Sequence, residues 1–131
     1  MAIKEAIVAA ENIMGVDSVI NYDEIPNCIF TIPEIASVGK KEGITGKFPF
    51  IANGKAKTSG ETEGFVKVYL ENDKLVGASI IGSNASSLIA VVQGLLGKTV
   101  PELKKMVLAH PTLPEAIIEA VLQAKGEVIN L

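Results

Sequence analysis

The chain has 131 residues and a mass of 13.8 kDa, a length that predicts a single domain. Its 48% hydrophobic and 21% charged residues are close to the globular average, which excludes a disordered or collagen-like chain. Fifteen acidic residues outnumber twelve basic ones, and every basic residue is a lysine; because the chain lacks the arginine forks that grip phosphate and guanine, nucleic-acid binding is not expected.

The first segment, residues 2–14, is predicted to be a helix. Apolar residues recur on one of its faces: Ile3, Ile7, Ala10 and Met14. Gly15 marks its expected end, and residues 16–25 are expected to form a connector.

The next part of the chain indicates β-structure. Residues 28–32 are good strand formers, and the two prolines that bound them limit the strand's length. A second short apolar piece, residues 48–51, predicts another strand, and Asn53-Gly54 directly after it is typical of a turn.

The clearest local pattern is a β-hairpin. Residues 65–70 alternate between apolar and other side chains, Asn72-Asp73 supplies a turn, and residues 75–81 return. One face of the first strand is expected to be buried: Val66, Val68 and Leu70.

A helix follows, capped by Asn84 or Ser86 and ending near Leu96. Its apolar stripe is wide: Leu88, Val91, Val92 and Leu95. Residues 75–97 carry no charge and are long enough to span a bilayer, but the polar block at 82–87 would leave backbone groups unpaired in lipid. A strand, a turn and a helix of a soluble core are therefore predicted, with no membrane partner.

Two further helices complete the chain. Pro101 opens a short helix over residues 102–107, and Thr112 can cap a last helix that runs to about Lys125. The buried face of the last helix is expected to hold Ile117, Ala120, Val121 and Ala124. The predicted fold class is α+β, an antiparallel sheet of about four or five strands covered by helices.

The chain contains one cysteine, Cys28, and one histidine, His110. A single cysteine excludes an internal disulphide and a C-x4-C redox pair, and one cysteine with one histidine cannot form a usual zinc site, so no metal is expected. The sequence contains no Gly-x-Gly and therefore no dinucleotide-binding fingerprint. Cys28 is expected to be a small buried side chain. The cysteine usage and a start that does not resemble a signal peptide predict a cytoplasmic location.

The segment that indicates chemistry is His110-Pro111-Thr112-Leu113-Pro114-Glu115. In one interpretation Thr112 and Glu115 form a T-x-x-E capping box at a helix start, and His110 is only a loop residue. In the other, Glu115 folds back to one ring nitrogen of His110, fixes its tautomer and leaves the other nitrogen as a general base. The two interpretations compete for one carboxylate.

The same hexapeptide resembles the His-Pro-Thr-x-x-Glu signature of the pyridine nucleotide-disulphide oxidoreductases. Residues 25–39 resemble the opening strand of that family's C-terminal dimerisation domain, residues 46–56 its next strand and turn, and residues 64–67 and 75–78 its hairpin. Within the family these segments are most similar to the dihydrolipoamide dehydrogenases. The resemblance covers almost the whole chain.

The resemblance implies that the chain is part of a larger, homodimeric enzyme. Residues 1–22 would be the last helix and linker of a preceding FAD domain, and residues 23–131 the dimerisation domain. FAD and NAD would bind to other parts of the enzyme and not to this chain, which alone would be inactive. The substrate would be a lipoylated protein of a 2-oxoacid dehydrogenase or glycine cleavage complex.

The resemblance also implies roles for two residues across the dimer interface. His110 would take a thiol proton from dihydrolipoamide, Glu115 would orient His110, and Pro111 would hold a turn in which the family often has a cis bond. Two positions depart from the family pattern: Leu108 stands where a second histidine is common, and Pro114 where serine is common. The alternatives are a free-standing homodimeric interaction module, or the equivalent domain of another flavin disulphide reductase.

Overall fold

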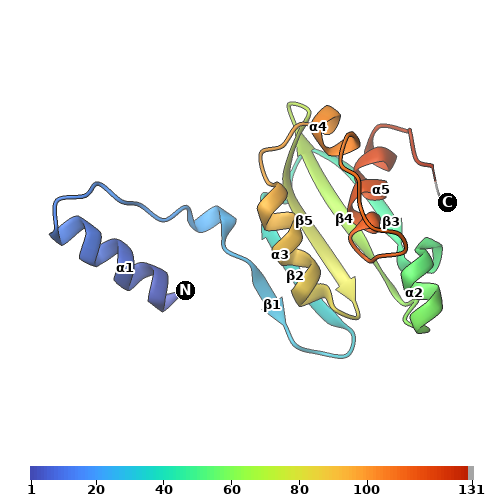
Figure 1. Cartoon of the computed structure of the whole chain (residues 1–131), viewed down its shortest axis with the longest axis horizontal. Coiled ribbons are helices and arrows are strands. Elements are labelled where there is room, and N and C mark those ends of the chain that lie inside the picture. The colour runs from blue at the N-terminus through green and yellow to red at the C-terminus, as the bar shows by residue number, and fades with distance from the viewer. Residues whose placement is uncertain (130–131) are drawn as a thin grey trace.

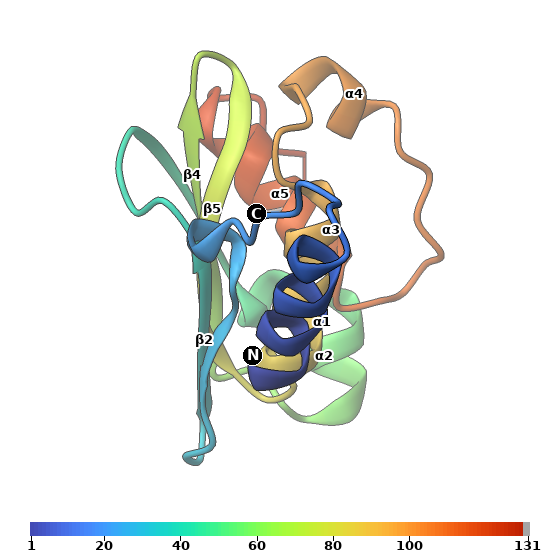
Figure 2. The same ribbon diagram turned by 90° about the vertical axis from the view of Figure 1, so that its left-hand side faces the viewer.

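The computed structural model describes residues 1–129. A five-stranded antiparallel sheet has helices on one face, and Figure 2 shows this sheet from its edge. The strands lie in the order β1-β2-β5-β4-β3. Their bounds are β1 Asn27–Ile29, β2 Glu34–Gly39, β3 Ile44–Pro49, β4 Gly64–Glu71 and β5 Lys74–Gly82. The predicted α+β class and the predicted sheet are confirmed.

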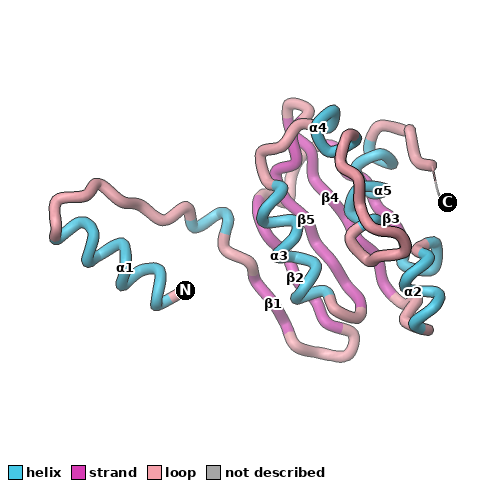
Figure 3. The backbone as a smooth tube through the Cα atoms, viewed as in Figure 1, coloured by secondary structure: helices cyan, strands magenta, loops and turns pink. Residues whose placement is uncertain are grey.

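The helices are distributed along the chain as Figures 1 and 3 show. Their bounds are α1 Ala2–Ile13, α2 Gly54–Ser59, α3 Ala85–Leu95, α4 Val100–Lys104 and α5 Glu115–Ala124, with short 3-10 turns η1 Tyr22–Glu24 and η2 Phe50–Ala52. Helix α3 packs on β2 and β5, and α5 packs on β3 and β4. These two helices therefore cover the two halves of the sheet and enclose the aliphatic core.

The hairpin of β4 and β5 forms as predicted. Its turn residues Asn72 and Asp73 have φ angles of 50° and 63°, a conformation that asparagine and aspartate tolerate better than most residues. The side chains expected on the inner face are at most 1% exposed: Val66, Val68 and Leu70. Both strands of the hairpin lie inside the sheet, with β5 in the middle and β4 between β5 and β3.

The strand predicted over residues 28–32 is shorter than expected. Strand β1 ends at Ile29, and Ile32 is fully exposed in the connection to β2. There the hydroxyl of Thr31 donates to the carbonyl of Pro33 at 2.7 Å, and the Ile32–Pro33 bond is cis. The apolar run thus spans the end of one strand and the tip of the connection, because proline cannot donate to a continuing ladder.

Strand β3 begins at Ile44, earlier than predicted, and its position depends on a glycine. A Cβ atom on Gly46 would lie 1.8 Å from the carbonyl oxygen of Ala120 in α5. Only glycine allows the helix to approach the strand this closely. The contact fixes how α5, and with it Glu115, sits on the sheet.

Asn53-Gly54 is not a simple turn, and in this the prediction was wrong. Asn53 is the N-cap of α2, a helix of six residues that the sequence analysis missed. Its side-chain oxygen accepts from the N–H of Ala56 at 3.0 Å. Asparagine is favoured both in turns and at N-caps, so the dipeptide alone does not separate the two.

Helix α3 begins where expected, but neither predicted cap residue caps it. Asn84 occupies the N-cap position and makes no side-chain cap bond. The carboxylate of Glu34 on β2 accepts instead from the N–H of Ser86 at 2.9 Å and from its hydroxyl at 2.7 Å. These bonds hold the pKa of Glu34 below its ordinary value, with the backbone N–H of Ser86 the largest cause.

Helix α4 is shorter and begins earlier than predicted, over Val100–Lys104. Thr99 and Glu102 form a capping box at its start, because each side chain accepts a hydrogen bond from the backbone N–H of the other residue. A T-x-x-E pattern therefore does start a helix in this chain, at α4.

Helix α1 lies apart from the sheet, as Figure 1 shows, and none of its residues is buried. Its bonds to the following connector join Asn12 to Ser18 and Tyr22 to Glu5. The apolar face that the sequence indicates stays uncovered in the described structure. Within residues 1–129 no helix is long and apolar enough to cross a membrane.

Candidate functional site

His110 lies on the long loop that joins α4 to α5. The loop passes over the start of α2, and the His110–Pro111 peptide bond is cis. A Cβ built on Gly54, the first residue of α2, would meet Pro111 Cβ at 3.5 Å and His110 Cε1 at 3.8 Å. The loop thus lies so close to the start of α2 that a side chain at position 54 would touch both Pro111 and the imidazole.

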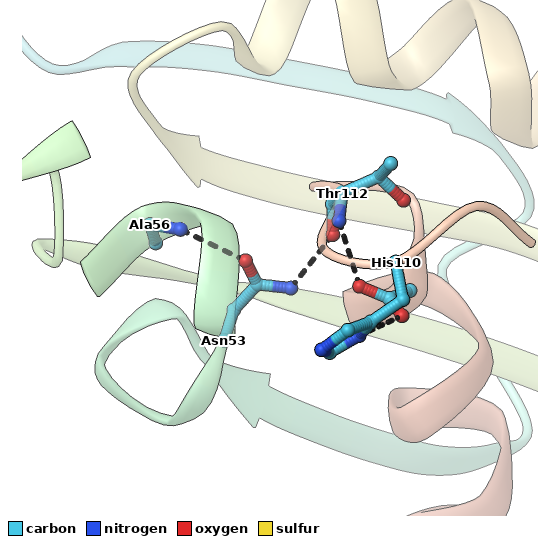
Figure 4. Close-up of polar contacts among 5 residues, drawn as sticks. Asn53, Ala56, His110 and Thr112 are labelled. Carbon is cyan, nitrogen blue, oxygen red and sulfur yellow. Dashed lines mark hydrogen bonds and ion pairs between the residues drawn. The ribbon is translucent and has the colours of Figure 1, made fainter. Parts of the chain in front are cut away.

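The carboxylate of Glu115 contacts both His110 and the backbone of Thr112. Its Oε1 lies 2.8 Å from His110 Nδ1, and its Oε2 accepts from the N–H of Thr112 at 2.8 Å. Figure 4 shows these contacts together with their neighbours. The carboxylate therefore makes both contacts at once, because each uses a different oxygen.

The predicted helix start at Thr112 is wrong. Helix α5 begins at Glu115, with Pro114 in the N-cap position and no side-chain cap bond. Only half of the T-x-x-E capping box is present, the half in which the acid accepts from a backbone N–H. Pro114 fits this position because it has no N–H that would need a partner in the first turn.

The electrostatic environment keeps Glu115 ionised at neutral pH. Burial of the carboxyl group favours its neutral form, but the N–H of Thr112 and the contact with His110 outweigh this effect, so the pKa of Glu115 is lowered. An ionised carboxylate can only accept hydrogen bonds, so Nδ1 must be the donor. The neutral ring then carries its lone pair on Nε2.

The other side of the imidazole is open. The His110 side chain is 78% exposed, and Nε2 makes no hydrogen bond to any residue in the range 1–129. An exposed Nε2 with a carboxylate behind Nδ1 is an arrangement that can remove a proton from a bound group and then stabilise the charged ring.

A pocket of about 370 Å³ adjoins the pair. His110 and Glu115 form part of its wall together with apolar side chains: Phe48, Met106, Leu108 and Ile118. Leu108, one of the two departures from the family pattern, thus lies in the same wall as His110. Glu119 also lines the pocket, is 7% exposed, and accepts from the N–H of Ile129 at 3.2 Å.

Sequence reasoning missed Asn53 as part of this site. Asn53 is 3% exposed and lines the pocket, but its neighbour in the loop is 59 positions away. The only local signal was the Asn-Gly pair, which predicts a turn. Cys28 lies on β1, the edge strand opposite β3, where it is half-buried and packs against the core.

Residues 1–129 contain no group of three or more histidine, cysteine, aspartate or glutamate side chains that could hold a metal ion.

Comparison with protein families gives one match over most of the chain. Residues 25–121 match the family model described as "Pyridine nucleotide-disulphide oxidoreductase, dimerisation domain". The match begins near the start of β1 and ends within α5, so it includes both His110 and Glu115.

Similar proteins are dihydrolipoyl dehydrogenases. The chain is 43% identical over 141 residues to that of Geobacillus stearothermophilus, covering 97% of this chain and 30% of the relative. It is 38% identical over 140 residues to dihydrolipoyl dehydrogenase 3 of Haloarcula marismortui, covering 97% of this chain and 29% of that one. The chain thus spans less than a third of these relatives.

Solved structures agree on the fold. LpdA from Mycobacterium tuberculosis superposes with a TM-score of 0.78 at 28% identity, over 87% of this chain and 28% of that chain. The HOCl-induced flavoprotein disulfide reductase RclA from Escherichia coli superposes with a TM-score of 0.72 at 19% identity, over 88% of this chain and 30% of that one. At 19% identity the second structure supports the fold alone.

Proposed function

The chain belongs to the pyridine nucleotide-disulphide oxidoreductases, as a dimerisation domain of that family, and we propose that it serves a dihydrolipoyl dehydrogenase by supplying the base for dithiol oxidation. The observation that carries the proposal is the contact of 2.8 Å between His110 Nδ1 and Glu115 Oε1, beside an exposed Nε2. The relatives named dihydrolipoyl dehydrogenase support this choice within the family.

His110 would act on the thiol of dihydrolipoamide. A thiolate attacks a disulphide and a thiol does not, so a base must first remove the proton. Nε2 would accept that proton, and the ring would become an imidazolium. Glu115 would then stabilise the charge, because its ionised carboxylate already faces Nδ1.

The remaining chemistry would come from other parts of the enzyme. FAD, reached through a redox-active disulphide, would carry the electrons on to NAD. The exposure of His110 fits a site that is completed by a second surface, and we propose that this surface belongs to the other subunit of a homodimer. We further propose that residues 1–22 belong to a preceding FAD domain and residues 23–131 to the dimerisation domain, and that the substrate is a lipoylated protein.

A domain graft tests the proposal. Residues 25–131 replace the equivalent segment of the Geobacillus stearothermophilus enzyme, which is 43% identical. We expect the graft to oxidise dihydrolipoamide, and we expect His110→Gln in the graft to lower the rate by about 10²- to 10⁴-fold, the usual contribution of a general base. The flavin absorbance and the dimeric mass of both proteins serve as controls.

Two outcomes would contradict the proposal. One is a His110→Gln graft that oxidises the dithiol as fast as the unsubstituted graft. The other is an unsubstituted graft that binds flavin and dimerises but does not turn over, because the domain would then be unable to supply the base.

A further inference from the structure

Asn53 lies between α2 and the loop that carries His110, and its side chain is bonded in both directions. Oδ1 accepts from the N–H of Ala56 at 3.0 Å, and Nδ2 donates to the carbonyl of Thr112 at 3.0 Å. Figure 4 shows the amide between these two partners. Because Asn53 is only 3% exposed, water competes little for either bond.

Thr112 joins this amide to the acid–base pair. Its carbonyl accepts from Asn53, while its N–H donates to Glu115 Oε2 at 2.8 Å. The second oxygen of the same carboxylate lies 2.8 Å from His110 Nδ1. An unbroken series of hydrogen bonds therefore leads from the first turn of α2 to the imidazole.

The closeness of Gly54 to the loop supports the same connection. The ideal Cβ position of Gly54 lies 3.5 Å from Pro111 and 3.8 Å from the imidazole Cε1. The start of α2 therefore lies close to the loop at two neighbouring residues, Gly54 by proximity and Asn53 by its hydrogen bond to Thr112.

We propose that Asn53 is a positioning residue for this site. It fixes the backbone of Thr112, and it thereby holds Glu115 where its carboxylate keeps the proton on Nδ1 of His110 and the lone pair on Nε2. The effect of Asn53 on the tautomer of His110 can be measured in this chain without the rest of an enzyme. Its consequence for catalysis rests on the proposed function of His110.

The contacts require an amide at this position. Aspartate and serine are as good as asparagine at an N-cap, so either can still accept from Ala56. Aspartate would place a second oxygen against the carbonyl of Thr112, and serine has no second arm to reach it. Serine therefore keeps the cap of α2 and removes the bond to the loop, whereas aspartate keeps the cap and replaces that bond by a repulsive contact.

The test uses the 131-residue chain and its single histidine, which gives one unambiguous pair of imidazole ¹⁵N signals. In the unsubstituted chain, at a pH where the ring is neutral, we expect the Nδ1–H tautomer to dominate. In Asn53→Ser and Asn53→Asp we expect the ratio of the Nδ1–H to the Nε2–H tautomer to fall by about fivefold, the value of one hydrogen bond. Far-ultraviolet circular dichroism checks that the variants are folded.

A matched control is available at Asn21. Its side chain also accepts from a backbone N–H, that of Asp23, and donates to a second partner, Glu24 Oε1 at 2.8 Å. Asn21→Asp and Asn21→Ser remove the same kind of donor in the connector, and we expect both to leave the tautomer ratio of His110 unchanged. If Asn53→Asp does not fold because of its added charge, Asn53→Ser decides the question.

The inference is overturned if the folded Asn53 variants keep the tautomer ratio of the unsubstituted chain. In the graft described above, Asn53→Ser should lower kcat by about five- to tenfold while KM for the dithiol changes less than about twofold. If His110 is not the base, the His110→Gln graft will oxidise the dithiol as fast as the unsubstituted graft. The ¹⁵N measurement would still decide the role of Asn53. The two failures are therefore distinguishable.

Discussion

The carboxylate of Glu115 is shared between a side chain and the backbone. One oxygen accepts from the N–H of Thr112, and the other faces His110 Nδ1. Both bonds can form at once because Glu115 is the first residue of α5, and its carboxylate can reach back from there to the loop. The local spacing of the hexapeptide was sufficient to predict each contact, although not their coexistence.

Replacing Glu115 by glutamine should invert the tautomer of His110. Glutamine has one oxygen, and the backbone N–H of Thr112 can only be satisfied by that oxygen. The NH₂ group then faces Nδ1 and donates to it, which moves the ring proton to Nε2. We expect the imidazole ¹⁵N spectrum of Glu115→Gln to show mainly the Nε2–H form.

Glu102→Gln is the control for this prediction. Glu102 also accepts from the backbone N–H of a threonine, Thr99 at 2.8 Å, but in the capping box of α4. Its replacement should leave the histidine signals unchanged. An Nδ1–H form that persists in folded Glu115→Gln would show that the carboxylate does not set the tautomer.

At the scale of elements, the sequence predicts the segments whose pattern is local. The β4–β5 hairpin and α3 follow from apolar spacing over a few residues, so both are where they were expected. The first half of β3 and helix α2 were missed because their positions depend on distant residues. Gly46 is explained only by the backbone of α5 against it, and Asn53 only by a partner 59 positions away.

Helix α3 depends for its start on Glu34, which belongs to another element. Since the bonds from Ser86 lower the pKa of Glu34 in the folded chain, the folded state binds a proton there less readily than the unfolded state. The resulting stabilisation is complete above the ordinary glutamate pKa of 4.5 and is lost as the pH falls through the lowered folded value. Acid should therefore loosen the contact between β2 and α3.

The measurement is the urea midpoint of the unsubstituted chain and of Glu34→Gln, near pH 7 and near pH 3. We expect the variant to be less stable near neutral pH and the difference between the two proteins to shrink in acid. Glu42→Gln is the control, because Glu42 makes no side-chain hydrogen bond or ion pair within the described residues. A difference for Glu34→Gln that is the same at both pH values would refute the role of its charge.

At the scale of the whole molecule, the helices differ in how much of their apolar surface they bury against the rest of the chain. Helix α5 buries most of its apolar side chains within the chain: Ala116, Ile117, Ala120, Val121 and Leu122. Helix α5 therefore leaves little apolar surface for a second subunit, and the proposed homodimer rests on the family match. Helix α1 is the opposite case, since it buries none of its residues.

Removal of residues 1–22 should leave the rest of the chain as stable as before. The bonds that hold α1 join it to the connector that is removed with it, and the bond from Gln93 to the carbonyl of Glu24 remains. We expect the free energy of unfolding of residues 23–131 to change by less than about 0.5 kcal/mol, the usual range for sites outside the core. A loss of about 2 kcal/mol or more in urea unfolding would mean that α1 stabilises the sheet.

Amide exchange gives an independent check: a 12-residue helix without tertiary cover is marginal in water, so the amides of α1 should exchange far faster than those of β4 and β5.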